Sequence, residues 1–111
     1  MDKINRYKKI VREILEVLAT RVPVNTPTIK KRLVINADQS EFILVSVGQR
    51  QNAYHYNVLA HLAIQNGKIF IYAESIDPSF YERLTDKGIP ESDILPVYLP
   101  DFELDAAVVT V

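Results

Sequence analysis

The two histidines are the side chains best suited to acid–base chemistry or metal binding in this sequence. His55 and His61 both fall within residues 54–65, whose alternating pattern predicts a β-strand. On a regular strand they would share a face and stand about 20 Å apart, too far to bind one metal ion. We therefore interpret both as ordinary strand residues. A hydrolytic or small-molecule site built around His61, a mid-strand polar group that needs a partner, is kept as a third hypothesis.

Other signatures of catalysis are missing from the sequence. The absence of cysteine excludes disulfides, thiol catalysis, thiolate zinc sites and iron–sulfur ligation. With three glycines and no G-x-S-x-G, P-loop or G-x-G-x-x-G motif, the chain offers no loop to cradle a phosphate. Asp101, Glu103 and Asp105 alternate without the glycine and closing glutamate of a calcium loop, which favours a solvated edge segment. We expect no enzymatic activity, no metal and no cofactor.

Charge is divided unevenly along the chain. Residues 1–35 carry nine basic and three acidic residues, a net charge of +6, whereas residues 36–111 carry −7. The two parts could attract each other, within the fold or between subunits. Alternatively, the basic part could face nucleic acid or an acidic protein.

The candidate DNA contact is the basic run Lys30, Lys31 and Arg32. Strand alternation places Lys30 and Arg32 on one face and Lys31 on the other. No aromatic residue lies in the run to stack on bases, and charged residues also block edge-to-edge pairing of strands. Direct DNA binding is therefore the alternative hypothesis, and it would be weak, sequence-tolerant and salt-dependent.

Aromatic residues point to a protein interface. The chain has six tyrosines and four phenylalanines, and tyrosine is enriched where proteins meet. Tyr54 and Tyr56 project on one face of their predicted strand. The expected partner contact is the exposed sheet face together with the apolar and acidic segment 98–111, in which Tyr98 and Phe102 are the candidate partner-binding residues. The tyrosines also lead us to expect self-association, as a homodimer.

Periodic patterns predict a helix followed by four strands. Apolar residues at helical spacing begin after Asp2, a suitable N-cap, and the helix stops before Pro23. Strands are predicted at 28–38, 42–47, 54–65 and 68–74, with a polar loop at 48–53. Asn66-Gly67 predicts a type I′ turn between the last two strands. Strands two to four should therefore form an antiparallel meander.

A second helix is predicted at 75–88, with Asp77 as N-cap, Pro78 in the first turn and Gly88 past its end. One helical turn at 91–93 and short strands at 94–99 and 106–111 follow. Together these elements predict a single α+β domain over 1–111, an antiparallel sheet with two main helices packed on it. No apolar run approaches the ~20 residues of a membrane span, and no signal peptide opens the chain, so we expect a soluble cytoplasmic protein.

Several segments together resemble the XisI family, the excision controlling factors of the cyanobacterial fdxN element. The most specific are residues 1–7 (MDKINRY), 66–71 (NGKIFI) and 88–95 (GIPESDIL). Residues 47–48 (VG) and 61–62 (HL) add to the match, which covers nearly the whole chain. Departures mark a divergent member: residues 72–76 replace an acidic turn, Tyr98-Leu99-Pro100 lacks a histidine, and 101–105 lacks an arginine.

The resemblance implies an α+β, XisI-like fold and a non-enzymatic accessory role in site-specific excision of a DNA element. Family members commonly act beside a recombinase and with a companion, XisH, which resembles endonuclease-fold proteins. An XisH-like partner is therefore expected, and contact with DNA would then be indirect.

Overall fold

The described residues form a helix, four strands, a second helix, a short 3-10 turn and a fifth strand. The computed structural model describes residues 2–21 and 28–99. The elements are α1 (Lys3–Thr20), β1 (Ile29–Ile35), β2 (Glu41–Arg50), β3 (Ala53–Gln65), β4 (Lys68–Glu74), α2 (Phe80–Asp86), η1 (Glu91–Asp93) and β5 (Ile94–Pro96). This is the predicted order. The strand expected at 106–111 lies outside the described residues.

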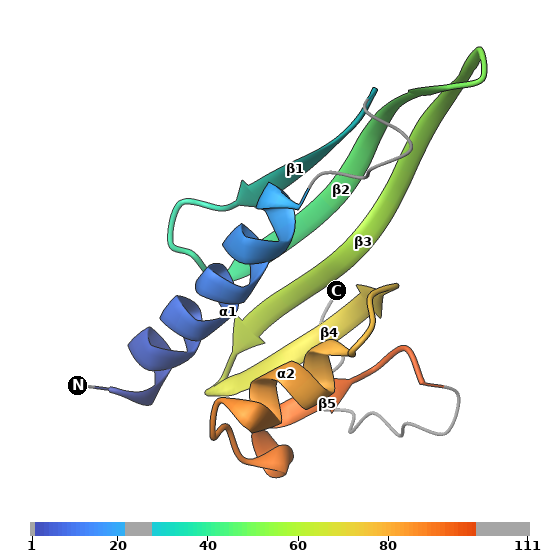
Figure 1. The fold of residues 1–111 in the computed structure, drawn as a ribbon. Coiled ribbons are helices and arrows are strands. Elements are labelled where there is room, and N and C mark those ends of the chain that lie inside the picture. Colours follow the sequence, from blue (N-terminus) through green and yellow to red (C-terminus); the bar gives the residue numbers. More distant parts are fainter. Residues whose placement is uncertain (1, 22–27, 100–111) are drawn as a thin grey trace.

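All five strands join one sheet in the order β1-β2-β3-β4-β5 (Figure 1). β2 to β4 form the predicted antiparallel meander, and β1 extends it by pairing antiparallel with β2. β5 adds a parallel pairing at the edge of β4. Both helices lie on one face of the sheet, here called the inner face, and the opposite side is the outer face (Figure 1). The α+β class with two helices on the sheet is confirmed.

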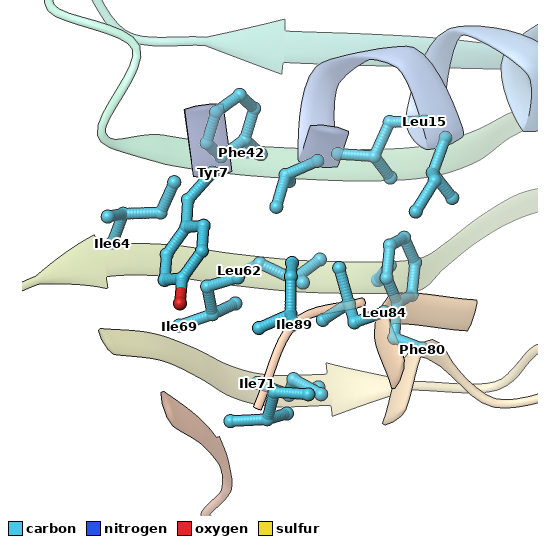
Figure 2. Packing of buried hydrophobic residues seen from close by; sticks show 14 of the residues in the cluster. Tyr7, Leu15, Phe42, Leu62, Ile64, Ile69, Ile71, Phe80, Leu84 and Ile89 are labelled. Atoms are coloured by element: carbon cyan, nitrogen blue, oxygen red, sulfur yellow. The ribbon is translucent and has the colours of Figure 1, made fainter. Parts of the chain in front are cut away.

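The core lies between α1, α2 and the inner face of the sheet (Figure 2). Asp2 caps α1 as predicted, because its carboxylate accepts a hydrogen bond from the backbone N–H of Asn5 at 2.8 Å. The helix then buries one stripe of side chains: Tyr7, Val11, Ile14, Leu15 and Leu18. They pack against fully buried sheet residues that include Phe42, Leu62 and Ile71. Each such side chain stabilises the fold by about 1.5–3 kcal/mol relative to exposure.

The second helix starts later than predicted. Its N-cap is Ser79, whose hydroxyl accepts from the backbone N–H of Glu82 at 3.2 Å, so the prediction of Asp77 is wrong. The carboxylate of Glu74 accepts from the N–H of Phe80 at 2.6 Å and satisfies a second free donor of the first turn. Two acceptors therefore fix the start at Phe80. Gly88, at a φ of +88°, lies past the C-terminal end as predicted.

The β2–β3 connection is shorter than the predicted polar loop at 48–53. It is a two-residue turn at Gln51 and Asn52, with φ values of +52° and +66°, and both strands continue to its edges. Two positive φ angles match the twist of a tight hairpin. Side chains near the turn are exposed on both faces, so polar residues fit a strand there without cost. Asn66-Gly67 forms the other tight turn, as predicted.

A β-bulge divides β3 into two parts with opposite side-chain orientation. Leu44 pairs with Ala60 but Val45 pairs with Val58, which leaves Leu59 as the extra residue. Tyr54, Tyr56 and Val58 therefore share the outer face with His61, whereas Ala60 and Leu62 lie on the inner face. A regular strand was assumed in the prediction, and the bulge overturns it.

Candidate functional site

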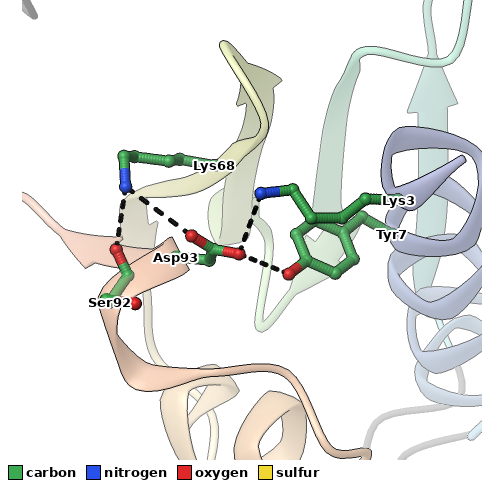
Figure 3. Close-up of polar contacts among 5 residues, drawn as sticks. All are labelled: Lys3, Tyr7, Lys68, Ser92 and Asp93. Carbon is green, nitrogen blue, oxygen red and sulfur yellow. Dashed lines mark hydrogen bonds and ion pairs between the residues drawn. The ribbon is translucent and has the colours of Figure 1, made fainter.

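Three segments that carry the family resemblance meet in one polar cluster around Asp93 (Figure 3). The Tyr7 hydroxyl donates to Oδ2 of Asp93 at 2.5 Å, and the Lys3 ammonium lies 3.3 Å from the same oxygen. Lys68 Nζ stands 3.6 Å from Oδ1 and also donates to the carbonyl of Ser92 at 3.1 Å. The cluster ties the first turns of α1 to the start of β4 and to η1.

The contacts within the cluster keep Asp93 ionised and Tyr7 protonated at neutral pH. The hydrogen bond from Tyr7 and the ammonium of Lys3 lower the pKa of Asp93, although burial opposes them. Burial, followed by the bond to the Asp93 carboxylate, raises the pKa of Tyr7 to about 12. At neutral pH the ionised carboxylate of Asp93 therefore accepts a hydrogen bond from the protonated hydroxyl of Tyr7. Asp93 and Tyr7 are 8% and 1% exposed, so the pair holds the fold and does not present itself to a ligand.

The two histidines lie on opposite faces of the sheet, contrary to the prediction. His55 Nε2 lies 2.8 Å from the Ser46 hydroxyl, on the inner face. His61 Nε2 lies 2.8 Å from a carboxylate oxygen of Glu41, and its ring centroid is 5.1 Å from that of Tyr72, on the outer face. The β3 bulge causes this separation. The two imidazoles therefore cannot act on one substrate together.

The basic run is split between the two faces, as strand alternation predicts. Lys31 points to the inner side, where its ammonium donates to the carbonyl of Leu18 at the end of α1, at 3.0 Å. Burial, together with the charge of Arg21, lowers the pKa of Lys31. Lys30 and Arg32 are exposed on the outer face. The three residues therefore do not form one surface.

The basic run contains no aromatic residue, but strand pairing brings aromatic residues of β3 close to Lys30 and Arg32. Lys30 pairs with Val47, which pairs with Tyr56. We call Lys30, Arg32, Tyr54, Tyr56 and Val58 the outer-face patch. Tyr54 is 74% exposed, Tyr56 57% and Val58 36%. Tyr54 and Tyr56 were visible as aromatic strand residues, but their proximity to Lys30 depends on strand order, which a local pattern does not encode.

The candidate partner-binding residue Tyr98 lies beyond β5 at the edge of the sheet. Tyr98 is 40% exposed, and its hydroxyl donates to Glu74 Oε2 at 2.6 Å. Burial and the neighbouring Glu74 carboxylate raise the pKa of Tyr98 to about 12. Leu99 beside it is 42% exposed. Phe102 lies outside the described residues, as do Asp101, Glu103 and Asp105.

A hollow of about 460 Å³ lies between α1 and α2. Its apolar lining comes from α1, including Ile14 and Val17. Charged residues of both signs, among them Glu13, Arg83 and Asp86, also line it. The mixed charges give no preference for an anion or a cation. Within residues 2–21 and 28–99, no helix has the length and apolarity to cross a membrane.

These features define a small α+β protein whose polar cluster is structural and whose exposed side chains suit binding. The sequence matches the family model of the XisI protein over residues 1–105, and the chain belongs to the XisI family.

Solved structures agree in fold. A XisI-like protein from Anabaena variabilis superposes with a TM-score of 0.75 at 22% identity, covering 84% of each chain. The fdxN element excision controlling factor XisI from Anabaena variabilis gives a TM-score of 0.74 at 24% identity, covering 90% of this chain and 96% of that one. Among curated proteins the comparison finds no match.

Proposed function

We propose that this protein is a non-enzymatic accessory factor for the excision of a DNA element, acting through an endonuclease-like partner of the XisH type. Membership of the XisI family is the observation that carries the proposal. The similar fold of the protein described as the fdxN element excision controlling factor supports it. The proposal places the protein in the cytoplasm with its DNA target.

The placement of the titratable side chains supports a role without turnover. Asp93 is buried and bonded to Tyr7, and it therefore cannot reach a substrate. His61 is engaged by Glu41, and His55 faces the other side of the sheet beside Ser46. A general acid–base pair needs both groups within hydrogen-bond reach of one substrate, and the two histidines, on opposite faces of the sheet, do not meet that requirement together.

In this proposal the partner contacts the edge of the sheet formed by β5, next to Tyr98. A tyrosine that is 40% exposed and anchored through its hydroxyl loses little conformational freedom on binding. Leu99 extends this apolar surface, and Phe102 follows in sequence. Interfaces of this kind draw most of their affinity from a few aromatic anchors, with surrounding charges setting specificity.

Co-purification with an XisH-type companion tests the proposal. The double variant Tyr98→Ala with Phe102→Ala should lose the companion while remaining folded. The matched control is Tyr54→Ala, which removes an exposed tyrosine from β3 beside the β2–β3 turn, two strands away from β5, and should keep the companion. A protein that binds no companion but cleaves DNA or a phosphate ester, with His61→Ala abolishing the activity, would overturn the non-enzymatic role. Sedimentation of the protein alone checks the expected dimer.

A further inference from the structure

The outer-face patch presents two aromatic rings to solvent at the end of the sheet that carries the β2–β3 hairpin. Figure 1 shows this hairpin extending past the end of α1. Tyr54 and Tyr56 are two residues apart on the same face of β3, which separates their Cα atoms by about 7 Å. Among the described residues neither hydroxyl has a hydrogen-bond partner, whereas those of Tyr7 and Tyr98 do. The structure therefore leaves both rings free for an external contact.

Two cations flank the rings on the same face. Lys30 is in register with Tyr56 through Val47, and Arg32 is in register with Val58 through Val45. Since neighbouring strands lie about 4.8 Å apart, the backbones of Lys30 and Tyr56 are about 10 Å apart. Neither cation forms an ion pair with a residue in the described part of the chain.

The parts of β1, β2 and β3 that surround the patch carry no negative charge. Residues 28–37 and 42–73 contain no aspartate or glutamate. The carboxylate that β2 contributes, Glu41, lies at the opposite end of that strand and contacts His61. The patch therefore combines exposed π-faces with uncompensated positive charge, which is the chemistry of surfaces that bind unpaired nucleotides.

We propose that the outer-face patch binds single-stranded nucleic acid. Bases stack on Tyr54 and Tyr56, and the ammonium of Lys30 and the guanidinium of Arg32 contact the phosphates. This activity goes beyond the proposed accessory function and does not depend on the XisH-type complex, whose contact lies at the Tyr98 edge.

Charge disfavours a second copy of this chain as the occupant. A two-fold contact places the same patch on both sides of the interface. Lys30 and Arg32 of one copy would then face a surface that carries the same two cations and, within residues 28–37 and 42–73, no carboxylate. A polyanion satisfies those charges, and a flat base also covers the rings.

The test is fluorescence anisotropy with a labelled oligothymidylate and with a duplex of the same length, at low salt. The native protein should prefer the single strand. The double variant Tyr54→Leu with Tyr56→Leu keeps apolar bulk but removes the π-faces, so affinity should fall at least about tenfold. The matched double variant Tyr54→Phe with Tyr56→Phe keeps the π-faces and should bind like the native protein.

The cations are tested by salt dependence. Lys30→Ala with Arg32→Ala should weaken binding and flatten the slope of log affinity against log salt by about 1.4, because two phosphate contacts are lost. Lys9→Ala with Lys87→Ala removes the same charge from two exposed positions, one in α1 and one at the end of α2. This variant should leave that slope nearly unchanged.

Three results would overturn the proposal. The first is native binding to oligothymidylate that is absent or unaffected by the leucine pair. The second is duplex binding as tight as single-strand binding, which would mean that charge alone is responsible. The third is a native dimer in sedimentation that the leucine pair dissociates, which would make a second copy the occupant. Circular dichroism of each variant confirms that it is folded.

Discussion

The two ends of the sheet differ in what their side chains do. At the end near the start of α1, the sheet is covered by helices, and the buried carboxylate of Asp93 is tied to Tyr7, Lys3 and Lys68. At the end near the β2–β3 hairpin, Tyr54 and Tyr56 are exposed. Packing and the polar cluster therefore maintain the fold at one end, whereas the exposed rings at the other end contribute little to the core.

The largest expected effect comes from the covered region. Phe42 is fully buried against both strand and helix residues, so Phe42→Ala removes a large apolar side chain and leaves a cavity. We expect the free energy of unfolding to fall by about 3–5 kcal/mol. Urea denaturation followed by circular dichroism measures it. A loss below about 1 kcal/mol would show that this region is not the core.

The next largest effect comes from the polar cluster. Asp93→Ala leaves the Tyr7 hydroxyl buried without its acceptor and removes the side-chain contacts of Tyr7 and Lys3 that link α1 to η1. We expect a loss of about 2–3 kcal/mol, since the hydrogen bond is charge-assisted and one partner stays buried. Asp86→Ala, at an exposed position of α2, is the matched control and should change stability by less than about 0.5 kcal/mol. Equal effects of the two variants would remove the cluster from the account of stability.

The cluster also predicts how stability depends on pH. The pKa of Asp93 is lowered in the folded state, so its contribution is present above the unfolded value near 4 and is lost as pH falls through the folded value. The pKa of Tyr7 is raised to about 12, so its contribution is present below about pH 10 and is lost as pH rises toward 12. The urea midpoint is measured across pH for the native chain and for Tyr7→Phe. The fall in midpoint between pH 10 and 12, here called the alkaline limb, should be smaller in the variant. Identical alkaline limbs would contradict the assignment.

The smallest effect on stability is expected at the exposed end. Tyr54→Leu with Tyr56→Leu should change the free energy of unfolding by less than about 0.5 kcal/mol per site, because surface positions rarely contribute more. The melting temperatures of the leucine pair and of Asp93→Ala, each compared with that of the native protein, measure this difference. A melting temperature lowered as far as in Asp93→Ala would mean that the rings support the fold.

Local signals in the sequence were sufficient for most of the fold. Asn66-Gly67 fixed a hairpin because few residues tolerate its positive φ angles, and the apolar stripe from Tyr7 to Leu18 fixed the first helix. The start of α2 was predicted incorrectly, because Ser79 caps the helix and Glu74, six residues before Phe80, supplies a second acceptor for its first turn.

The sites were harder to predict because they depend on strand pairing. The bulge at Leu59 moves His61 to the face opposite His55, and nothing in the alternation of β3 marks it. Lys3, Lys68 and Asp93 are distant in sequence, so their cluster required the tertiary structure. The split of Lys30 and Arg32 from Lys31 was predictable, because it follows from alternation alone. Their proximity to Tyr56 required the sheet order.

The most direct test of separate binding surfaces is to follow backbone amide chemical shifts by NMR during two titrations. Addition of an XisH-type companion should perturb the residues around Tyr98, at 94–99, and leave the outer-face patch unchanged. Addition of oligothymidylate should perturb residues around Lys30 and Tyr56 and leave the Tyr98 edge unchanged. Perturbation of the same residues by both ligands, or of neither surface by its expected ligand, would contradict the account.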